Sequence, residues 1–104
     1  MRRNKEFHDY IVYDAFKDIP GITSRPMFSG WGIYKDGKIF SLIIGGELYF
    51  KVSDKNRSEF EKSDSHPFVY PRKGKSITMS YWTLPDEILE NKEILLVWIN
   101  NCFR

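Results

Sequence analysis

The dipeptide Asp36-Gly37 restricts the fold of this chain more than any other feature of its sequence. It separates two runs rich in apolar residues, Trp31–Tyr34 and Ile39–Ile44. A two-residue type I′ turn needs positive φ at both central positions, and Asp-Gly adopts this conformation readily. Gly45-Gly46 predicts a second tight turn, which leads into Glu47–Val52. We therefore expect an antiparallel meander over these residues.

Alternation of apolar side chains predicts the faces of the third strand in this meander. A period of two places Phe40, Leu42 and Ile44 on one face, opposite Ile39 and Ile43. A strand with apolar residues on both faces is typical of the centre of a sheet.

The fourth and first strands of the meander give two further predictions. Leu48, Phe50 and Val52 are expected to face inward in the fourth strand. The first strand, Thr23–Phe28, contains Pro26, which has no amide hydrogen to donate to a strand ladder. We therefore expect this strand either at an edge of the sheet or interrupted by a bulge.

A long helix is expected before the sheet. Its apolar residues recur at helical spacing, and the helix should run from about Asn4 to Asp18, where Pro20-Gly21 ends it. The residues expected on its apolar face are Phe7, Tyr10, Ile11 and Ala15.

Shorter helices are expected after the meander. Ser53 or Asp54 can cap a helix anchored by Phe60, because a side-chain oxygen accepts from a free backbone amide. Pro85 suits the first position of a helical turn. Asn91 can cap the last helix, which runs from about Lys92 to Cys102.

A further hairpin is expected between the middle and last helices. Lys73-Gly74 marks its turn, and the run after it alternates cleanly. Ile77, Met79 and Tyr81 should lie on one face, and Ser76, Thr78, Ser80 and Trp82 on the other. The stretch before the turn is expected to be a strand or a loop.

Together these elements predict an α+β fold. An antiparallel sheet carries the N-terminal, middle and C-terminal helices on one face. Residues 1–104 are expected to form a single domain. The interior should be rich in rings, because 16% of the residues are aromatic; Phe40 and Trp82 in particular are expected to be buried.

Composition excludes several classes of protein. A hydrophobic fraction of 41% indicates a globular chain, and no apolar run approaches the ~18 residues of a membrane span. A net charge of +2 argues against a dedicated nucleic-acid binder. A single cysteine, Cys102, and the lack of a signal peptide favour a reducing cytoplasm. On its helix, Cys102 is interpreted as a buried, unreactive thiol.

The residues that could carry chemistry do not form a site. Gly30-x-Gly32 lacks the third glycine and the following helix of a phosphate-binding loop. His8 and His66, with one cysteine, have no ligand-like spacing and are interpreted as surface or loop-capping residues. We expect no enzymatic activity, no metal and no cofactor.

One motif favours a nucleic acid. Arg72, Lys73 and Lys75 flank the glycine turn and are candidate phosphate contacts, although the same pattern is typical of a solvated turn. Any such binding is expected to be weak and independent of sequence.

Four segments together resemble the N-terminal domain of the TfoX/Sxy family of bacterial competence regulators. They are Arg25-x-Met27-Phe28-x-Gly30, Leu48-Tyr49-x-Lys51, Asn56 with Phe60, and Ser80-Tyr81-Trp82-x-x-Pro85. The resemblance covers Arg25 to Trp98, about 70% of the chain. Ser29 departs from the pattern, because the family usually has a second glycine there.

The resemblance implies a compact α+β domain without known catalytic or cofactor residues. It also implies a role in transcription of DNA-uptake genes, exercised with an activator rather than by promoter recognition alone. The family's regulators typically carry a second, C-terminal domain, which we do not expect in this chain. We therefore expect a non-enzymatic protein-interaction module; a direct nucleic-acid binder is the alternative.

Two surfaces are candidates for such contacts. Arg25, Met27 and Phe28 precede the first predicted turn and are expected to form a small exposed patch. In the last helix, six consecutive apolar residues cover the whole circumference, whereas packing on one side needs a stripe of little more than 100°. We expect Leu96 and Ile99 to contact a partner or a second copy of the chain, unless the helix is wedged between the first helix and the sheet.

Overall fold

The computed structural model describes residues 4–27 and 29–104. In chain order its elements are α1 (Lys5–Tyr10), the π-helical segment η1 (Ile11–Ala15), β1 (Ile22–Met27), β2 (Gly30–Lys35), β3 (Lys38–Ile44), β4 (Glu47–Lys51), α2 (Arg57–Glu61), β5 (Pro67–Arg72), β6 (Lys75–Thr83), α3 (Asp86–Leu89) and α4 (Lys92–Asn101). This confirms the predicted α+β class.

The strands form one sheet in the order β1-β2-β3-β4-β6-β5, and every neighbouring pair is antiparallel. The first four strands are the predicted meander, and β1, with Pro26, lies at an edge as expected. The predicted turns are also present. Asp36 and Gly37 have φ of 52° and 82°, and Lys73 and Gly74 have φ of 49° and 77°. These values belong to type I′ turns, whose twist matches that of the strands.

The predicted alternation in β3 is wrong at Phe40. Ile33 pairs with Ser41 and Tyr34 pairs with Ile39, so the register skips Phe40. A bulge of this kind places two successive residues on the same side of the strand. Phe40 therefore lies on the helix-covered face with Ile43, whereas Leu42 and Ile44 lie on the opposite face.

The phase of the first helix also differs from the prediction. Its buried residues are His8, Ile11, Val12 and Phe16, whereas Tyr10 is 44% exposed. Ile11 is in the core as predicted, and Phe7 and Ala15 pack against it, so the prediction is wrong for Tyr10 and missed His8, Val12 and Phe16. The buried residues keep ordinary helical spacing, although Ile11–Ala15 is a π-helical turn.

The main core lies between the sheet and all of the helices. Its members come from the first helix, the sheet, α2, the segment before α3, and α4. Phe40 and Phe50 lie 5.5 Å apart between ring centroids, and Phe60 and Trp98 lie 4.7 Å apart. This confirms that the helices pack on one face.

The middle helix begins later than predicted. Neither Ser53 nor Asp54 caps it; Asn56 occupies the N-cap position of α2. The Asn56 side chain is buried and accepts from the Ser53 amide, and it donates to the Lys51 carbonyl. These hydrogen bonds fix the turn by which the chain leaves β4. The Asn56 side chain itself does not cap α2.

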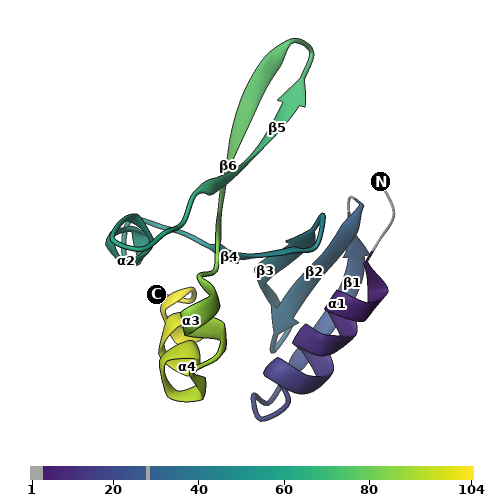
Figure 1. Ribbon diagram of the computed structural model, residues 1–104, viewed down its shortest axis with the longest axis vertical. Helices are drawn as coiled ribbons and strands as arrows, with labels where there is room; N and C mark the ends of the chain where they lie inside the picture. The colour runs from purple at the N-terminus through teal and green to yellow at the C-terminus, as the bar shows by residue number, and fades with distance from the viewer. Residues whose placement is uncertain (1–3, 28) are drawn as a thin grey trace.

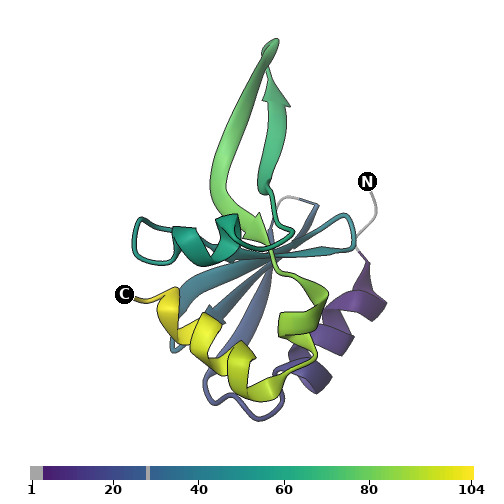
Figure 2. The ribbon, with the colours of Figure 1, turned by 60° about the vertical axis from the view of Figure 1, so that its left-hand side comes forward.

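The opposite face of the sheet carries a second, smaller cluster, whose members all come from strands. Leu42, Ile44 and Tyr49 are buried there, with Phe68 and Tyr81 packed against them. The far ends of β5 and β6 extend beyond this cluster as a two-stranded ribbon, away from the helices (Figures 1 and 2). The ribbon makes the molecule elongated, with extents of 42 × 30 × 24 Å.

Candidate interaction surfaces

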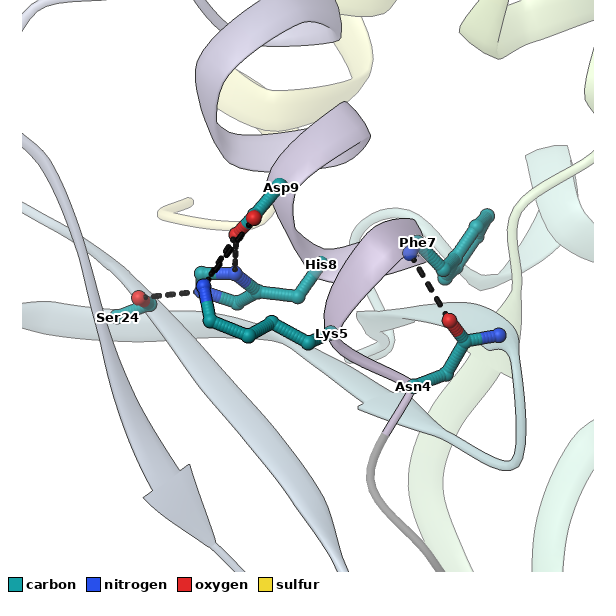
Figure 3. Close-up of polar contacts among 6 residues, drawn as sticks. All are labelled: Asn4, Lys5, Phe7, His8, Asp9 and Ser24. Carbon is teal, nitrogen blue, oxygen red and sulfur yellow. Dashed lines mark hydrogen bonds and ion pairs between the residues drawn. The ribbon is translucent and has the colours of Figure 1, made fainter.

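A group of hydrogen-bonded polar side chains lies under the first helix (Figure 3). His8 Nδ1 lies 2.8 Å from Asp9 Oδ1, and His8 Nε2 lies 2.8 Å from Ser24 Oγ. A carboxylate only accepts, so Nδ1 donates to Asp9 and a neutral ring accepts from the Ser24 hydroxyl. The expectation that His8 is a surface residue is wrong. Its ring is buried and lies 4.5 Å from Trp31 between centroids.

The order carboxylate, imidazole, hydroxyl is that of a hydrolase triad, which prompts the question of catalysis. Two facts give the group a structural role. The imidazole is 6% exposed. None of the main surface hollows in the described part of the chain is lined by His8 or Ser24. The hydrogen bonds instead attach the first helix to β1.

The carboxylate in this group has a perturbed titration. The hydrogen bond from His8, followed by that from Lys5, holds the pKa of the Asp9 carboxyl below its usual range. Lys5 Nζ lies 3.2 Å from Asp9 Oδ2. Both partners stabilise the ionised form.

The structure describes only two of the three residues in the patch predicted before the first turn. Arg25 is exposed, and its guanidinium carbon lies 5.7 Å from the centroid of the Tyr34 ring. Met27 is half-buried against Gly32, where a Cβ atom would lie 3.2 Å from its sulfur. Phe28 lies outside the described residues. Arg25 and Met27 both lie on the face of the sheet that carries the strand-only cluster.

The last helix divides its apolar residues between the core and the surface. Ile99, a predicted contact residue, is fully buried, so that prediction is wrong for Ile99. Ile94, Leu96 and Val97 are 41%, 43% and 55% exposed. We call these three residues the α4 patch. It adjoins a hollow of about 220 Å³ between η1 and α4, lined by Ala15, Asp18, Ile19, Lys92, Glu93, Leu95 and Leu96.

Cys102 follows α4 and is partly buried, rather than fully buried as expected. Its sulfhydryl donates to the Trp98 carbonyl over 3.3 Å. Burial raises the pKa of the Cys102 thiol to about 12. The nucleophilic thiolate is therefore scarce at neutral pH.

The predicted basic turn lies at the tip of the β5–β6 ribbon. Arg72, Lys73 and Lys75 are all exposed there. Residues 67–83 contain these three cations and no aspartate or glutamate. The structure thus collects the three charges at the end of a projecting element.

A larger hollow beside the ribbon was missed by the sequence reasoning. It measures about 470 Å³ and is lined by Val52, Ser53, Asp54, Arg57, Pro67, Thr78, Met79, Ser80 and Trp82. The Arg57 guanidinium carbon lies 5.8 Å from the centroid of the Trp82 ring. Trp82 is partly buried and packs against the main core, and it also lines this hollow. A signal was available, because the residues that share its face are the hydroxyl-bearing Ser76, Thr78 and Ser80.

Metal-ligand clusters and membrane-spanning helices are absent from residues 4–27 and 29–104. No three of their histidine, cysteine, aspartate and glutamate side chains come together in a way that could hold a metal ion. None of their helices has the length and apolar character needed to cross a bilayer.

Comparison with known proteins gives a consistent result. The profile of the TfoX N-terminal domain matches residues 14–104. The DNA transformation protein TfoX1 of Aliivibrio fischeri (strain ATCC 700601 / ES114) is 26% identical over 87 residues, which cover 84% of this chain and 41% of that protein. Protein Sxy of Escherichia coli (strain K12) is 22% identical over 71 residues, which cover 68% of this chain and 34% of Sxy. The chain therefore spans less than half the length of these relatives.

Proposed function

Because this chain belongs to the TfoX N-terminal domain family, we propose that it is a non-enzymatic module that binds a partner protein in the transcriptional regulation of competence genes. The name of one relative, a DNA transformation protein, supports the link to competence. The burial of His8 within its own hydrogen bonds supports a non-catalytic role.

The observation that carries the proposal is the α4 patch. Three large apolar side chains, Ile94, Leu96 and Val97, are exposed within four residues. Apolar side chains scattered singly over a surface are ordinary, but three exposed on one short helix, one of them lining a hollow, favour a protein contact. We place the partner's contact on this patch, with a second copy of the chain as the other possible occupant.

The test uses the double variant Leu96→Glu/Val97→Glu in cells of the native organism. Burying a carboxylate at the contact opposes association, so transcripts of DNA-uptake genes should fall to the level of a strain that lacks the protein. Ser58→Glu, at an exposed position of α2, is the matched control and should leave transcript levels unchanged. Normal transcript levels in the double variant, with the protein folded and abundant, would refute the proposal.

Light scattering on purified protein separates the two occupants. If the wild type is a dimer and the double variant a monomer, the occupant is a second copy of this chain. If both are monomers, the patch serves another protein.

Direct binding of nucleic acid is the second candidate, favoured by the position of Arg72, Lys73 and Lys75 at the ribbon tip. A two-stranded ribbon fits the major groove of DNA. Three phosphate contacts would give a slope of about −2.7 in log affinity against log salt concentration. Reversing the three charges to glutamate should remove this dependence; a slope near zero in the wild type would exclude the candidate.

A further inference from the structure

The sheet has a third open edge besides those of its two terminal strands. On the side of β6 away from β5, β4 pairs only with Tyr81–Thr83. One more hydrogen bond, from the Val52 amide to the Ser80 carbonyl at 2.8 Å, closes this ladder. Beyond Ser80, no strand among the described residues pairs with this side of β6. The chain after β4 turns away there toward α2.

The direction of the backbone groups along this edge follows from the hairpin register. Arg72 and Lys75 flank the two-residue turn and form a hydrogen-bonded pair, and such pairs alternate with non-hydrogen-bonded ones. Ser76 and Thr78 belong to the non-hydrogen-bonded pairs. Their amide and carbonyl groups therefore point away from β5, in the same direction as the Ser80 carbonyl.

The two terminal strands carry prolines at the matching positions, whereas this edge does not. Pro71 pairs with Ser76, so its nitrogen points outward from β5. Pro26 pairs with Trp31 and likewise points outward from β1, because the Gly21 and Asp36 pair is hydrogen-bonded. A proline at an outward position removes the donor that an added strand would need. The edge at Ser76 and Thr78 keeps its donors.

The space beside this edge suits an added strand. The side chains of a strand alternate between its two faces. On one face the strand would meet the hollow that contains Arg57 and Trp82. On the other it would meet an apolar hollow of about 210 Å³, lined by Ile44, Phe68, Tyr70 and Met79.

Charge indicates what kind of strand fits. The ribbon has three cations at its tip and no acid. Beside the edge, Arg57 is already paired with Glu61 at 3.4 Å, and Asp54 lines the same hollow. A second copy of the ribbon would bring the tip cations together, which disfavours self-pairing. An acidic segment would be attracted to the tip.

From these observations we propose that the free edge of β6 at residues 76–80 binds an extended segment of a partner protein as an added strand. The segment alternates acidic side chains, which are attracted to the cations at the ribbon tip, with apolar side chains, which enter the hollow beside Ile44 and Met79. This is strand addition, in which main-chain hydrogen bonds supply affinity and alternate side chains supply specificity. The surface is separate from the α4 patch, and the inference does not depend on that patch.

The first probe is an end-blocked, fluorescein-labelled octapeptide of four Glu-Val repeats, followed by fluorescence anisotropy. The wild-type protein should bind it, and a Lys-Val peptide of equal length should not bind. Thr78→Pro removes the outward donor without touching the β5–β6 ladder, so the Kd should rise about tenfold or more. Val69→Pro, which pairs with Thr78 but faces the opposite edge, is the matched control and should leave the Kd unchanged.

Several outcomes would overturn the proposal. These are equal binding of both peptides, equal loss in both proline variants, or no binding of the Glu-Val peptide at millimolar concentration. Binding of duplex DNA by the ribbon in place of the acidic peptide would overturn it as well.

Amide hydrogen exchange in the wild type supplies an independent test if a proline variant fails to fold. The peptide should slow exchange at Ser76 and Thr78 but not at Ile77, whose amide already faces β5; unchanged exchange at Ser76 and Thr78 would refute the proposal. Leu96→Glu/Val97→Glu should bind the peptide normally, so failure at the β6 edge and failure at the α4 patch are distinguishable.

Discussion

His8 Nε2 lies 2.8 Å from Ser24 Oγ, and this contact joins the first helix to the edge strand of the sheet. The other ring nitrogen of His8 is held by Asp9, and the ring packs against Trp31. A buried imidazole with both nitrogens occupied, in a fold with few polar groups in its core, is expected to stabilise the domain.

Ser24→Ala should therefore lower the free energy of unfolding by about 1–3 kcal/mol, because it leaves a buried ring nitrogen without a partner. Urea denaturation of the two proteins measures this difference. Thr23→Ala changes an exposed neighbour on the same strand and should cost no more than about 0.5 kcal/mol. Equal effects of the two substitutions would show that the hydrogen bond contributes nothing.

The stability of the domain should depend on the ionisation of Asp9. Its folded pKa is depressed below the ordinary value of 3.8, so its contribution is present above that value and is lost as pH falls through the folded pKa. The difference in unfolding free energy between wild type and Asp9→Asn should thus be constant near neutrality and shrink in acid. A difference independent of pH down to acid denaturation would contradict this.

Phe40→Ala should lower the free energy of unfolding by about 3–5 kcal/mol, because the ring is fully buried and its removal leaves a cavity. The ring contacts Phe16 and Phe50, with centroids 6.0 and 5.5 Å away. Tyr13→Ala, at a ring that is 68% exposed, is the control and should change stability little. A small effect of Phe40→Ala on the denaturant midpoint would show that this bulged position is not part of the core.

Gly30→Ala should be far more damaging than Gly37→Ala. A Cβ atom at Gly30 would collide with the backbone carbonyl of Ile43 in the neighbouring strand, which cannot move without breaking the sheet. At Gly37 nothing lies within 4 Å, so the cost is only that of positive φ, about 1 kcal/mol. Thermal unfolding followed by circular dichroism compares the two variants, and equal melting temperatures would refute the expectation.

Iodoacetamide should modify Cys102 much more slowly in the native protein than in urea. Burial raises the thiol pKa from 9.0 to about 12, and only the thiolate reacts. The same shift means that stability falls as pH rises above 9.0, because the unfolded chain ionises first. Mass spectrometry of timed samples at pH 8 measures the rate, and similar rates in both states would contradict the burial of the thiol.

Prediction from sequence succeeded where short-range chemistry decides the structure. Asp36, Gly37 and Gly74 adopt positive φ because their own dihedral preferences require little help from the rest of the chain. The Asn91 cap follows similarly, since its side chain accepts from the Ile94 amide three residues away over 3.2 Å. The position of Pro26 in an edge strand was also predictable, because proline has no amide hydrogen to donate to a neighbouring strand.

Prediction failed where distant segments decide the outcome. The register of β2 against β3 places a bulge at Phe40, and contacts with Trp31 and Ser24 of the sheet enclose His8; neither has a local signature. The division of α4 into buried Ile99 and exposed Leu96 is similarly invisible in six consecutive apolar residues.

The sequence by itself thus determined the turns, the strand order of the meander and the class of the fold, because these depend on backbone preferences within a few residues. Only the tertiary structure decided which polar groups are enclosed and which edges stay open. The free side of Thr78 exists because the chain leaves β4 after Lys51, where Asn56 holds its exit. The same exit from β4 brings the Arg57 guanidinium over the Trp82 ring. No local sequence pattern predicts a contact between residues so far apart in the chain.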